Sequence, residues 1–414
     1  MSLSSVLKSK TTVSYHVNKK NKLVKTHKVR LYPSTKMRTI LDSLCDYNRY
    51  CYNKGLETWN DMYDESVIMG DKKLRPNEHK VRNELVDNKT DWQYQYSARV
   101  LQQAVHRLNH AWSNFFNPSM KNHFRPKFKS KRSSKQSFSS DRISVVNGHY
   151  LKLDSPYEAP ETFDLIKMSE NLRFNGEIKL VTITKRRDKY FASVTVQTEK
   201  TQSINRVKAT TGVDMNIKHI DWEKGYIDTL TDRMIFLQSR ITMYQRKLAR
   251  KRIVNPTHFR SHNYNKIQAK LNRDYLKIYN LQQDLIQKTT HELVVNYDNI
   301  GIEDLDVEAM KMNKHLAKNI QRGLFGRFKE VLTYKASWND INLVKVDRFY
   351  PSTQRCSECK FVKTKDTFGG KQTLGGDSIH KDHQTYYCYN CGAILDRDKN
   401  AVANLTQYVV GLTT

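Results

Sequence analysis

The chain has 414 residues, of which 38% are hydrophobic, enough for two or three domains with their own cores. Lysine and arginine number 71 against 42 acidic residues, so the formal net charge is +29, which favours a polyanionic partner, nucleic acid first. No apolar run reaches the roughly 18 residues of a membrane span, and the polar, basic N-terminus does not resemble a secretory signal. We therefore expect a cytoplasmic protein without a membrane partner.

The first predicted elements are a strand and a long helical region. Basic and apolar residues alternate over 25–31, which predicts the strand, and Tyr32-Pro33-Ser34 ends it. Helical spacing then continues over about 36–116. Cys45 and Cys51 fall in this region, apart from the other cysteines, and we interpret them as buried thiols. The apolar residues that carry the helical spacing are Leu41, Leu44, Cys45, Tyr52, Val100, Leu101, Val105, Leu108 and Trp112.

A basic run follows the helical region. Residues 121–135 contain seven lysines and arginines and no acid, with Phe124 and Phe128 among them. Such a run is as often a solvated face as a binding site. The high net charge and the interleaved rings favour contact with phosphates and bases here. The predicted nucleic-acid-binding residues are Arg125, Lys127, Lys129, Lys131 and Arg132.

The rest of the chain is β-rich at first and then alternates strands with helices. Residues 142–199 favour a small barrel or sandwich with a hairpin tip at 186–189. The order of the later elements predicts an α/β sheet. These elements are a strand ending at Asp214, a strand to Trp222, two helices over 231–296 separated near Pro256, a strand over 299–305, a helix over 324–339 and a strand over 342–346.

Two Cys-x-x-Cys pairs, separated by 28 residues, predict a structural zinc site. The gap is longer than the usual 15 to 20 or so residues, so we expect an inserted loop. His380 and His383 lie in that loop, and four thiolates already close a structural site, so we interpret both histidines as loop residues. The predicted zinc ligands are Cys356, Cys359, Cys388 and Cys391.

Three acidic residues suit a metal-dependent nuclease. Asp214 and Glu303 each end an apolar, strand-like run, and Asp398 precedes a helix-like tail. One acid after a strand is usually a cap or a surface turn, but three that converge could bind two Mg²⁺ ions for phosphodiester hydrolysis. No Ser-His-Asp order, Walker loop or dinucleotide-binding glycine pattern competes with this interpretation.

Several motifs together resemble the TnpB family, transposon-encoded relatives of type V CRISPR effectors. They are KVRLYP at 28–33, FRPKFKSKR at 124–132, GVDMNIK at 212–218, IGIEDL at 300–305, LVKVDRFYPSTQRCSEC at 343–359 and YCYNCGAILDRDKNAVANL at 387–405. The resemblance covers about residues 25–410. It implies an RNA-guided DNA endonuclease whose catalytic acids correspond to Asp214, Glu303 and Asp398. Asp396 then becomes a turn residue or helix cap.

The resemblance also implies a multidomain α/β fold and its partners. A small β-barrel (wedge) domain would comprise 1–35 and 121–205, and a helical recognition domain 36–120. A RuvC-like, RNase H-type nuclease domain would comprise 206–414, with a zinc-binding element inserted at 350–395. The implied partners are an omega-type guide RNA from the protein's own locus, one protein per RNA, and double-stranded target DNA beside a short flanking motif.

Three alternatives stay open. A compact type V CRISPR effector would share the same motifs. A guided repressor without cleavage would lack an acid, and all three are present. An unguided zinc-ribbon DNA-binding protein would leave the acids unexplained. The chain departs from the family pattern at Asn216 and Lys360, where glycine is common, and neither change removes a carboxylate.

Overall fold

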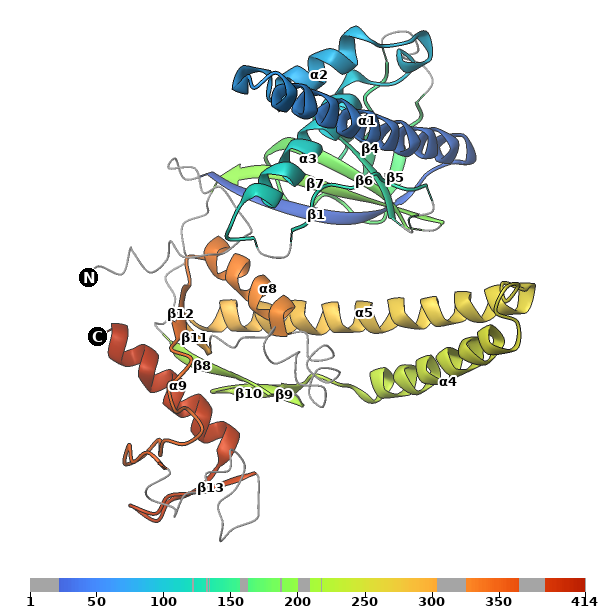
Figure 1. Cartoon of the computed structure of the whole chain (residues 1–414). Coiled ribbons are helices and arrows are strands. Elements are labelled where there is room, and N and C mark those ends of the chain that lie inside the picture. The colour runs from blue at the N-terminus through green and yellow to red at the C-terminus, as the bar shows by residue number, and fades with distance from the viewer. Residues whose placement is uncertain are drawn as a thin grey trace. The chain divides into compact units, whose positions relative to one another are not determined.

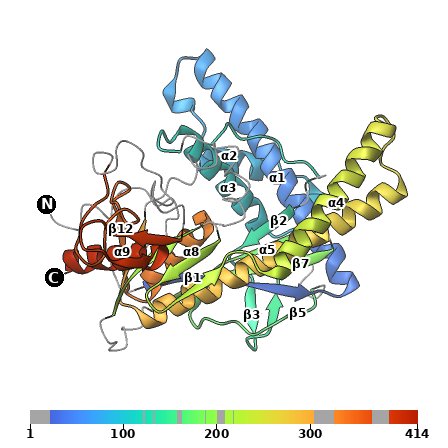
Figure 2. The same cartoon turned by 90° about the horizontal axis from the view of Figure 1, so that it is seen from below.

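The computed structural model describes residues 22–120, 123–131, 133, 135–156, 163–186, 188–199, 209–216, 218–303, 325–364 and 384–413. The chain divides into two compact units, residues 1–200 (unit 1) and 201–414 (unit 2) (Figures 1 and 2). Every helix within the described ranges is too short or too polar to span a bilayer.

Unit 1 is built on a seven-stranded antiparallel sheet with the order β2-β6-β7-β1-β5-β4-β3. A sandwich would need a second sheet, and a closed barrel would need a ladder between β2 and β3. The described part of unit 1 has neither, so the sheet there is open. The strands are β1 (Lys22–Tyr32), β2 (Lys135–Ser140), β3 (Ser144–Val146), β4 (Tyr150–Lys152), β5 (Ile166–Met168), β6 (Glu177–Arg186) and β7 (Lys189–Glu199).

Three helices accompany this sheet: the first and third pack on one of its faces, and the second packs against the other two. They are α1 (Thr35–Ile68), α2 (Glu78–Asp87) and α3 (Ala98–Phe116), with short 3₁₀ turns at Lys72–Leu74 and Asp91–Gln93. Each α-helix begins at a side chain that accepts a backbone N–H, which stabilises the first turn. The capping residues are Ser34, Asn77 and Ser97.

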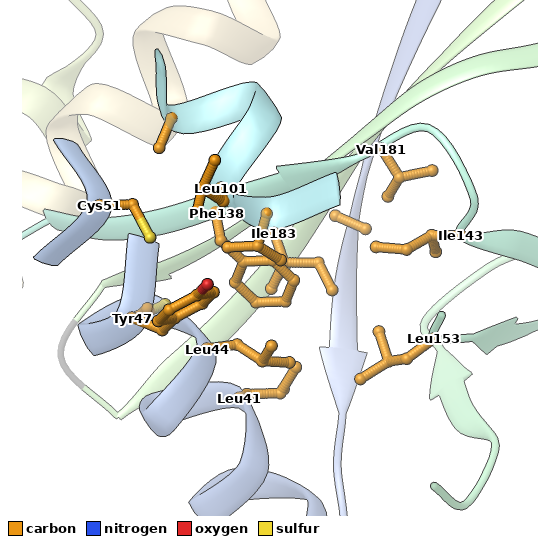
Figure 3. Packing of buried hydrophobic residues seen from close by; sticks show 14 of the residues in the cluster. Leu41, Leu44, Tyr47, Cys51, Leu101, Phe138, Ile143, Leu153, Val181 and Ile183 are labelled. Carbon is orange, nitrogen blue, oxygen red and sulfur yellow. The ribbon is translucent and has the colours of Figure 1, made fainter. Parts of the chain in front are cut away.

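The core of unit 1 lies between the helices and the sheet (Figure 3). Leu41 and Leu44 of α1 and Leu101 of α3 point toward Phe138 of β2 and Ile183 of β6, and all five are buried. Leu41, Leu44 and Leu101 carry the helical spacing visible in the sequence, so that spacing marks the face that packs on the sheet. Cys45 and Cys51 are buried in the same cluster, as predicted, and burial raises the pKa of each thiol to about 12.

Unit 2 is built on a five-stranded mixed sheet with the order β10-β9-β8-β11-β12. Strands β8, β11 and β12 are parallel, and β9 and β10 form an antiparallel hairpin beside β8. The strands are β8 (Thr210–Met215), β9 (His219–Trp222), β10 (Gly225–Asp228), β11 (Asn299–Glu303) and β12 (Asn342–Val346). This α/β arrangement was predicted, although β10 was not.

Helices join the strands of unit 2. Between β10 and β11 lie α4 (Asp232–Val254) and α5 (His262–Asn296), which run side by side (Figures 1 and 2). The break between them contains Pro256, as predicted, because proline cannot continue a helix interior. Helix α8 (Phe325–Trp338) joins β11 to β12, and β13 (Thr385–Tyr387) pairs with β14 (Ile394–Asp396) before the last helix, α9 (Arg397–Thr413).

Helix α9 lies directly on β8 and β11. Gly212 and Gly301 are register partners on these strands. A Cβ at position 212 would lie 2.4 Å from Leu405 Cβ and 2.7 Å from the carbonyl oxygen of Val402. A Cβ at position 301 would lie 2.4 Å from Val409 Cγ2. Only glycine allows so close a contact, and the contact places the start of α9 beside the sheet.

Candidate metal centres

Asp214 and Glu303 lie at the ends of neighbouring parallel strands. The ladder pairs Val213 of β8 with Ile302 of β11, and the next residue in each strand is the acid. Asp214 is 4% exposed. Burial, followed by the charges of Glu303 and Asp398, raises the pKa of Asp214 to about 7. The sheet therefore brings two of the predicted acids together.

Glu303 is oriented by a contact that the sequence did not reveal. Ser352 Oγ donates a hydrogen bond to Glu303 Oε1. The carbonyl oxygen of Ser352 in turn accepts from Asn404 Nδ2 of α9 at 2.9 Å. Burial raises the pKa of Glu303, although the bond from Ser352 opposes this. Ser352 and Asn404 thus tie the Glu303 carboxylate to α9.

Asp398 is the second residue of α9 and faces β9. Asp396 accepts the backbone N–H of Lys399 at 2.9 Å, so Asp396 is the helix cap, as predicted. The Oδ2 atom of Asp398 lies 2.8 Å from His219 Nε2, and its Oδ1 lies 3.3 Å from Arg397 Nη2. Burial acts to raise the pKa of Asp398, but the bonds from His219 and Arg397 hold it below its usual value.

Asp221 of β9 adds a fourth carboxylate to this edge. It is the register partner of Asp214 across the β8–β9 ladder, so both side chains leave the same face of the sheet. Burial raises the pKa of Asp221 to about 6, against the opposing effect of His219. The sequence signal that could have found it is the short hairpin after Asp214, whose register decides which residue faces the first acid.

His219 joins Asp221 and Asp398 in a compact ligand set. One ligand atom from each of the three lies within 4.8 Å of the others, and Asp214 and Glu303 are not members of this set. Four carboxylates crowded at one sheet edge repel one another, and a hard divalent cation with oxygen ligands relieves that repulsion. The donor set of the edge therefore fits divalent cations.

The four predicted zinc ligands meet at one point. Their sulfur atoms all lie within 4.8 Å of one another. The Sγ atoms of Cys356 and Cys391 are 3.8 Å apart, and those of Cys359 and Cys388 are 3.4 Å apart. Tetrahedral Zn–S bonds of about 2.3 Å separate sulfurs by about 3.8 Å, so the arrangement fits zinc. His380 and His383 lie outside the described residues.

The two cysteine pairs have matching backbone turns. Cys356 accepts the N–H of Lys360 at 3.0 Å, and Cys388 accepts the N–H of Gly392 at 3.0 Å. Lys360 and Gly392, each directly after its second cysteine, have φ of 66° and 75°. These are left-handed values that favour glycine. Lys360, one of the departures from the family pattern, therefore keeps the backbone conformation that glycine would adopt.

Helix α9 links the first cysteine pair to the sheet. Asn400 Oδ1 accepts from the backbone N–H of Ser357 at 2.8 Å. Asn400 Nδ2 and Asn404 Nδ2 both donate to the carbonyl oxygen of Arg355, at 2.8 and 2.6 Å. One face of α9 thus holds the cysteine turn, while the opposite face packs on Gly212. The position of Asp398 depends on both contacts.

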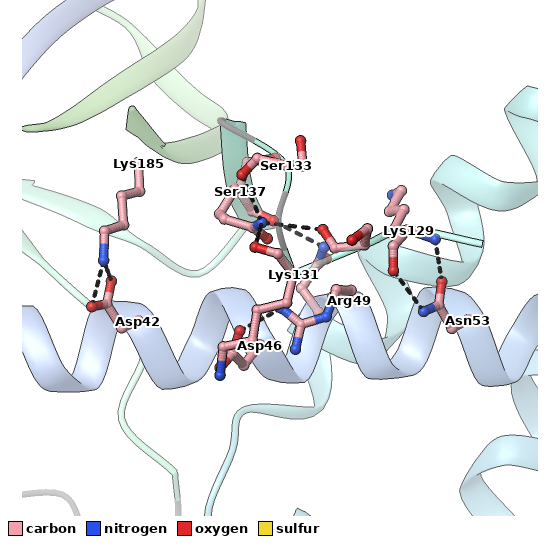
Figure 4. Close-up of polar contacts among 12 residues, drawn as sticks. Asp42, Asp46, Arg49, Asn53, Lys129, Lys131, Ser133, Ser137 and Lys185 are labelled. Carbon is pink, nitrogen blue, oxygen red and sulfur yellow. Dashed lines mark hydrogen bonds and ion pairs between the residues drawn. The ribbon is translucent and has the colours of Figure 1, made fainter. Parts of the chain in front are cut away.

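The predicted nucleic-acid-binding run is attached to α1 (Figure 4). We call its described residues 123–131 the basic segment. Asn53 accepts from the backbone N–H of Lys129 at 2.7 Å and donates to its carbonyl oxygen at 3.0 Å. Lys131 forms an ion pair with Asp46 at 2.9 Å. Lys129 Nζ lies 3.3 Å from the centre of the Tyr52 ring. These contacts fix the path of the segment.

The remaining members of the basic segment differ in their surroundings. Arg125 donates to Asn60 Oδ1 at 3.0 Å. Lys127 is exposed, and Phe124 and Phe128 are 80% and 62% exposed. Large exposed rings beside cations suit stacking on nucleic-acid bases. Arg132, the fifth predicted contact, lies outside the residues that the structure describes.

Three protein-family models match the chain. Their descriptions are "Helix-turn-helix domain" over residues 23–66, "Probable transposase" over 193–314 and "Cas12f1-like, TNB domain" over 325–405. The first description does not fit the fold, because residues 23–66 form β1 and most of the single helix α1. The third covers all of α8, β12, the four cysteines and the first half of α9.

Individual proteins are also similar. A "Putative RNA-guided DNA endonuclease" of Streptomyces pristinaespiralis is 27% identical over 91% of this chain and 87% of its own length. "TnpB-like protein L770" of Acanthamoeba polyphaga mimivirus is 28% identical over 66% of this chain, and the match spans half of that protein. A chain from the "Cryo-EM structure of the Cas12f1-sgRNA-target DNA complex" aligns with a TM-score of 0.48 and 13% identity, over 94% of this chain and 99% of that chain.

Proposed function

This chain belongs to the TnpB family, and from that premise we propose that it is an RNA-guided DNA endonuclease that cleaves double-stranded DNA beside a short flanking motif. The observation that carries the proposal is the meeting of Asp214, Glu303 and Asp398 at one sheet edge. A chain that only bound DNA would not need to confine buried carboxylates there.

We assign unit 2 to a RuvC-like, RNase H-type domain over 206–414. The support is a mixed sheet in which two neighbouring parallel strands lead to Asp214 and Glu303, and a last helix, α9, that carries Asp398. The four cysteines would hold a structural zinc ion within an inserted element at 350–395. In unit 1 we assign 1–35 and 121–205 to the wedge domain, although its described strands form an open sheet and not the expected closed barrel, and 36–120 to the recognition domain.

Asp214, Glu303 and Asp398 would hold two Mg²⁺ ions. When bound, such ions activate a water molecule and stabilise the leaving oxygen of the phosphodiester. The backbone of β8 and the packing around it fix Asp214, while Ser352 orients Glu303. Asp398 is placed by α9 and by its bond to His219. These contacts keep the carboxylates in position, so little reorganisation is needed during the reaction.

The expected nucleic-acid partners are an omega-type guide RNA, one protein per RNA, and the target DNA. The net charge of +29 and the exposed Lys127, Phe124 and Phe128 support this proposal. A compact type V CRISPR effector is the second candidate, favoured by the "Cas12f1-like, TNB domain" match over 325–405. A neighbouring repeat array would support the effector, and a flanking transposon end would support a transposon-encoded nuclease.

The first test is to express the protein with its native locus, purify it and sequence the RNA that co-purifies. We expect one species with a constant scaffold and a variable end, and this RNA then programs a cleavage assay in Mg²⁺. Asp214→Asn should abolish cleavage and keep RNA and DNA binding. Asp284→Asn removes an exposed acid of α5 that pairs with Lys288, and should cleave normally. Unrelated cellular RNA in the purified protein would overturn the guided function.

A further inference from the structure

We propose that His219, Asp221 and Asp398 form a cation position that prefers Mn²⁺ to Mg²⁺, so that the active site takes two unlike metal ions. The inference deepens the proposed nuclease, because Asp398 belongs to both ligand sets. It assigns a ligand role to two residues of β9 that lie outside the three acids.

The separations within this set suit a single ion. His219 Nε2 lies 2.8 Å from Asp398 Oδ2 and 3.5 Å from Asp221 Oδ2. Two ligands at right angles, each about 2.1 Å from a cation, are about 3.0 Å apart. These two separations lie on either side of that value, and the carboxylate oxygens of Asp221 and Asp398 lie within 4.8 Å of each other. An ion could therefore enter after small side-chain shifts.

Asp221 has a buried oxygen without a hydrogen-bond donor. Its Oδ2 atom makes no hydrogen bond among the described residues, and the contact it has there is the ion pair with His219 Nε2 at 3.5 Å. The side chain is 14% exposed and lies opposite Asp214, a second carboxylate. A buried carboxylate oxygen without a donor costs free energy. A cation beside Asp221 Oδ2 would remove that cost, and His219 Nε2 approaches the same atom.

The imidazole decides which cation fits. Carboxylates alone suit Mg²⁺, which binds oxygen ligands and gives up its water slowly. A nitrogen ligand shifts the preference from Mg²⁺ to first-row transition metals, and among these Mn²⁺ is the one that, like Mg²⁺, suits carboxylate ligands. The His219 side chain is 27% exposed, and its ring lies edge-on to Tyr226 with the ring centroids 6.3 Å apart. Its Nε2 atom faces the two carboxylates, so the deprotonated nitrogen is placed where it can act as a ligand.

A protonated His219 would act in the opposite way. It would be the counter-ion of Asp221 and Asp398 and would compete with a metal ion for the same place. Removing a competitor strengthens metal binding, whereas removing a ligand weakens it. The sign of the change in Mn²⁺ affinity on replacing His219 therefore separates the two roles.

The experiment titrates the zinc-loaded full chain, without RNA or DNA, with Mn²⁺ and counts free Mn²⁺ by its electron paramagnetic resonance signal. We expect His219→Ala and Asp221→Asn each to weaken the tighter Mn²⁺ site about tenfold or more. Asp284→Asn, which removes the exposed acid of α5 that pairs with Lys288, should change it little. Mg²⁺ competition should displace Mn²⁺ from wild type only at a large excess. Unchanged or tighter Mn²⁺ binding by His219→Ala would overturn the proposal.

A second measurement uses only the wild-type protein, so it does not depend on whether a variant folds. Electron spin echo modulation of Mn²⁺ bound to the wild-type protein should contain the signature of a directly bound imidazole nitrogen. Its absence, with Mn²⁺ bound, would also overturn the proposal. Neither readout depends on guided cleavage, so a protein that failed to co-purify a discrete RNA could still pass both, and the two proposals can fail separately.

Discussion

Gly212 and Gly301 face each other across the β8–β11 ladder, and α9 lies against both. Each glycine stands two residues before a predicted catalytic acid, Asp214 or Glu303. The two glycines therefore determine how closely α9, which carries Asp398, packs on the sheet. The glycines of these two motifs make the contact with α9, and the acids that follow them belong to the proposed metal site.

Gly212→Ala should damage both stability and cleavage. The new Cβ would meet backbone atoms of α9 at 2.7 and 2.8 Å, which cannot move without shifting the helix. We expect a loss of about 1–3 kcal/mol in the free energy of unfolding, measured by denaturant titration, and a large loss of cleavage. Gly326→Ala in α8 meets no atom within 4 Å and should be neutral or slightly stabilising. Normal cleavage by Gly212→Ala would contradict this role for α9.

The metal-free protein should lose stability as the pH rises. The folded-state pKa of Asp214 is about 7 and its unfolded value is near 3.8, so the folded state favours the protonated acid. This contribution is fully present below about pH 4 and is lost as the pH rises through 7, and it is worth a few kcal/mol. Thermal unfolding at pH 5.5 and 8, in buffer without Mg²⁺ and without chelator, tests it.

Two further thermal unfolding experiments test whether Asp214 is the group responsible for the pH dependence. Asp214→Asn should unfold at a higher temperature than wild type at pH 8, because an amide cannot ionise, and the difference should shrink at pH 5.5. Mg²⁺ should stabilise wild type more at pH 8 than at pH 5.5, because the cation binds the ionised carboxylates. A metal-free wild type that was more stable at pH 8 than Asp214→Asn would disprove the assignment.

Removing the zinc ligands should loosen α9 as well as the cysteine turns. The core around Cys356, Tyr386 and Cys388 is small, so we expect zinc to supply most of its folding energy. Cys356→Ser should lower the zinc content measured by mass spectrometry and speed hydrogen exchange in 351–364 and 397–413. Cys51→Ala removes a buried thiol of unit 1 and should keep full zinc content. Unchanged exchange in α9 after zinc loss would show that Asn400 and Asn404 do not couple the two.

Variants in and beside the basic segment should distinguish a residue that binds RNA from a residue that fixes the segment to α1. Lys127→Ala should weaken RNA binding, reduce the slope of log affinity against log salt by about one and leave the unfolding temperature unchanged. Asn53→Ala should weaken RNA binding and also lower stability, because it removes two bonds to the Lys129 backbone. Lys54→Ala, an exposed α1 cation paired with Glu57, is the control. Equal salt slopes for Lys127→Ala and wild type would exclude a phosphate contact.

Much of the fold follows from local sequence. Most helices and strands of unit 2 were predicted within a few residues, because apolar spacing and Pro256 act locally, whereas the short strands β10, β13 and β14 were not. Asp214, Glu303 and Asp398 were visible because each lies where a strand ends or a helix begins. His219 and Asp221 were missed because the register of a short hairpin depends on its turn, which spacing does not encode. The partners of Lys129 and Lys131 could not be predicted from the sequence either, since they lie on α1, far away along the chain.

His219 and Asp398 touch although they lie 179 positions apart in the sequence. Their contact needs β9 and α9 to be packed beside β8, because β9 carries His219 and α9 carries Asp398. The proposed metal site is therefore complete only when the sheet and the last helix of unit 2 are both in place, and a partly folded copy of the chain would lack it.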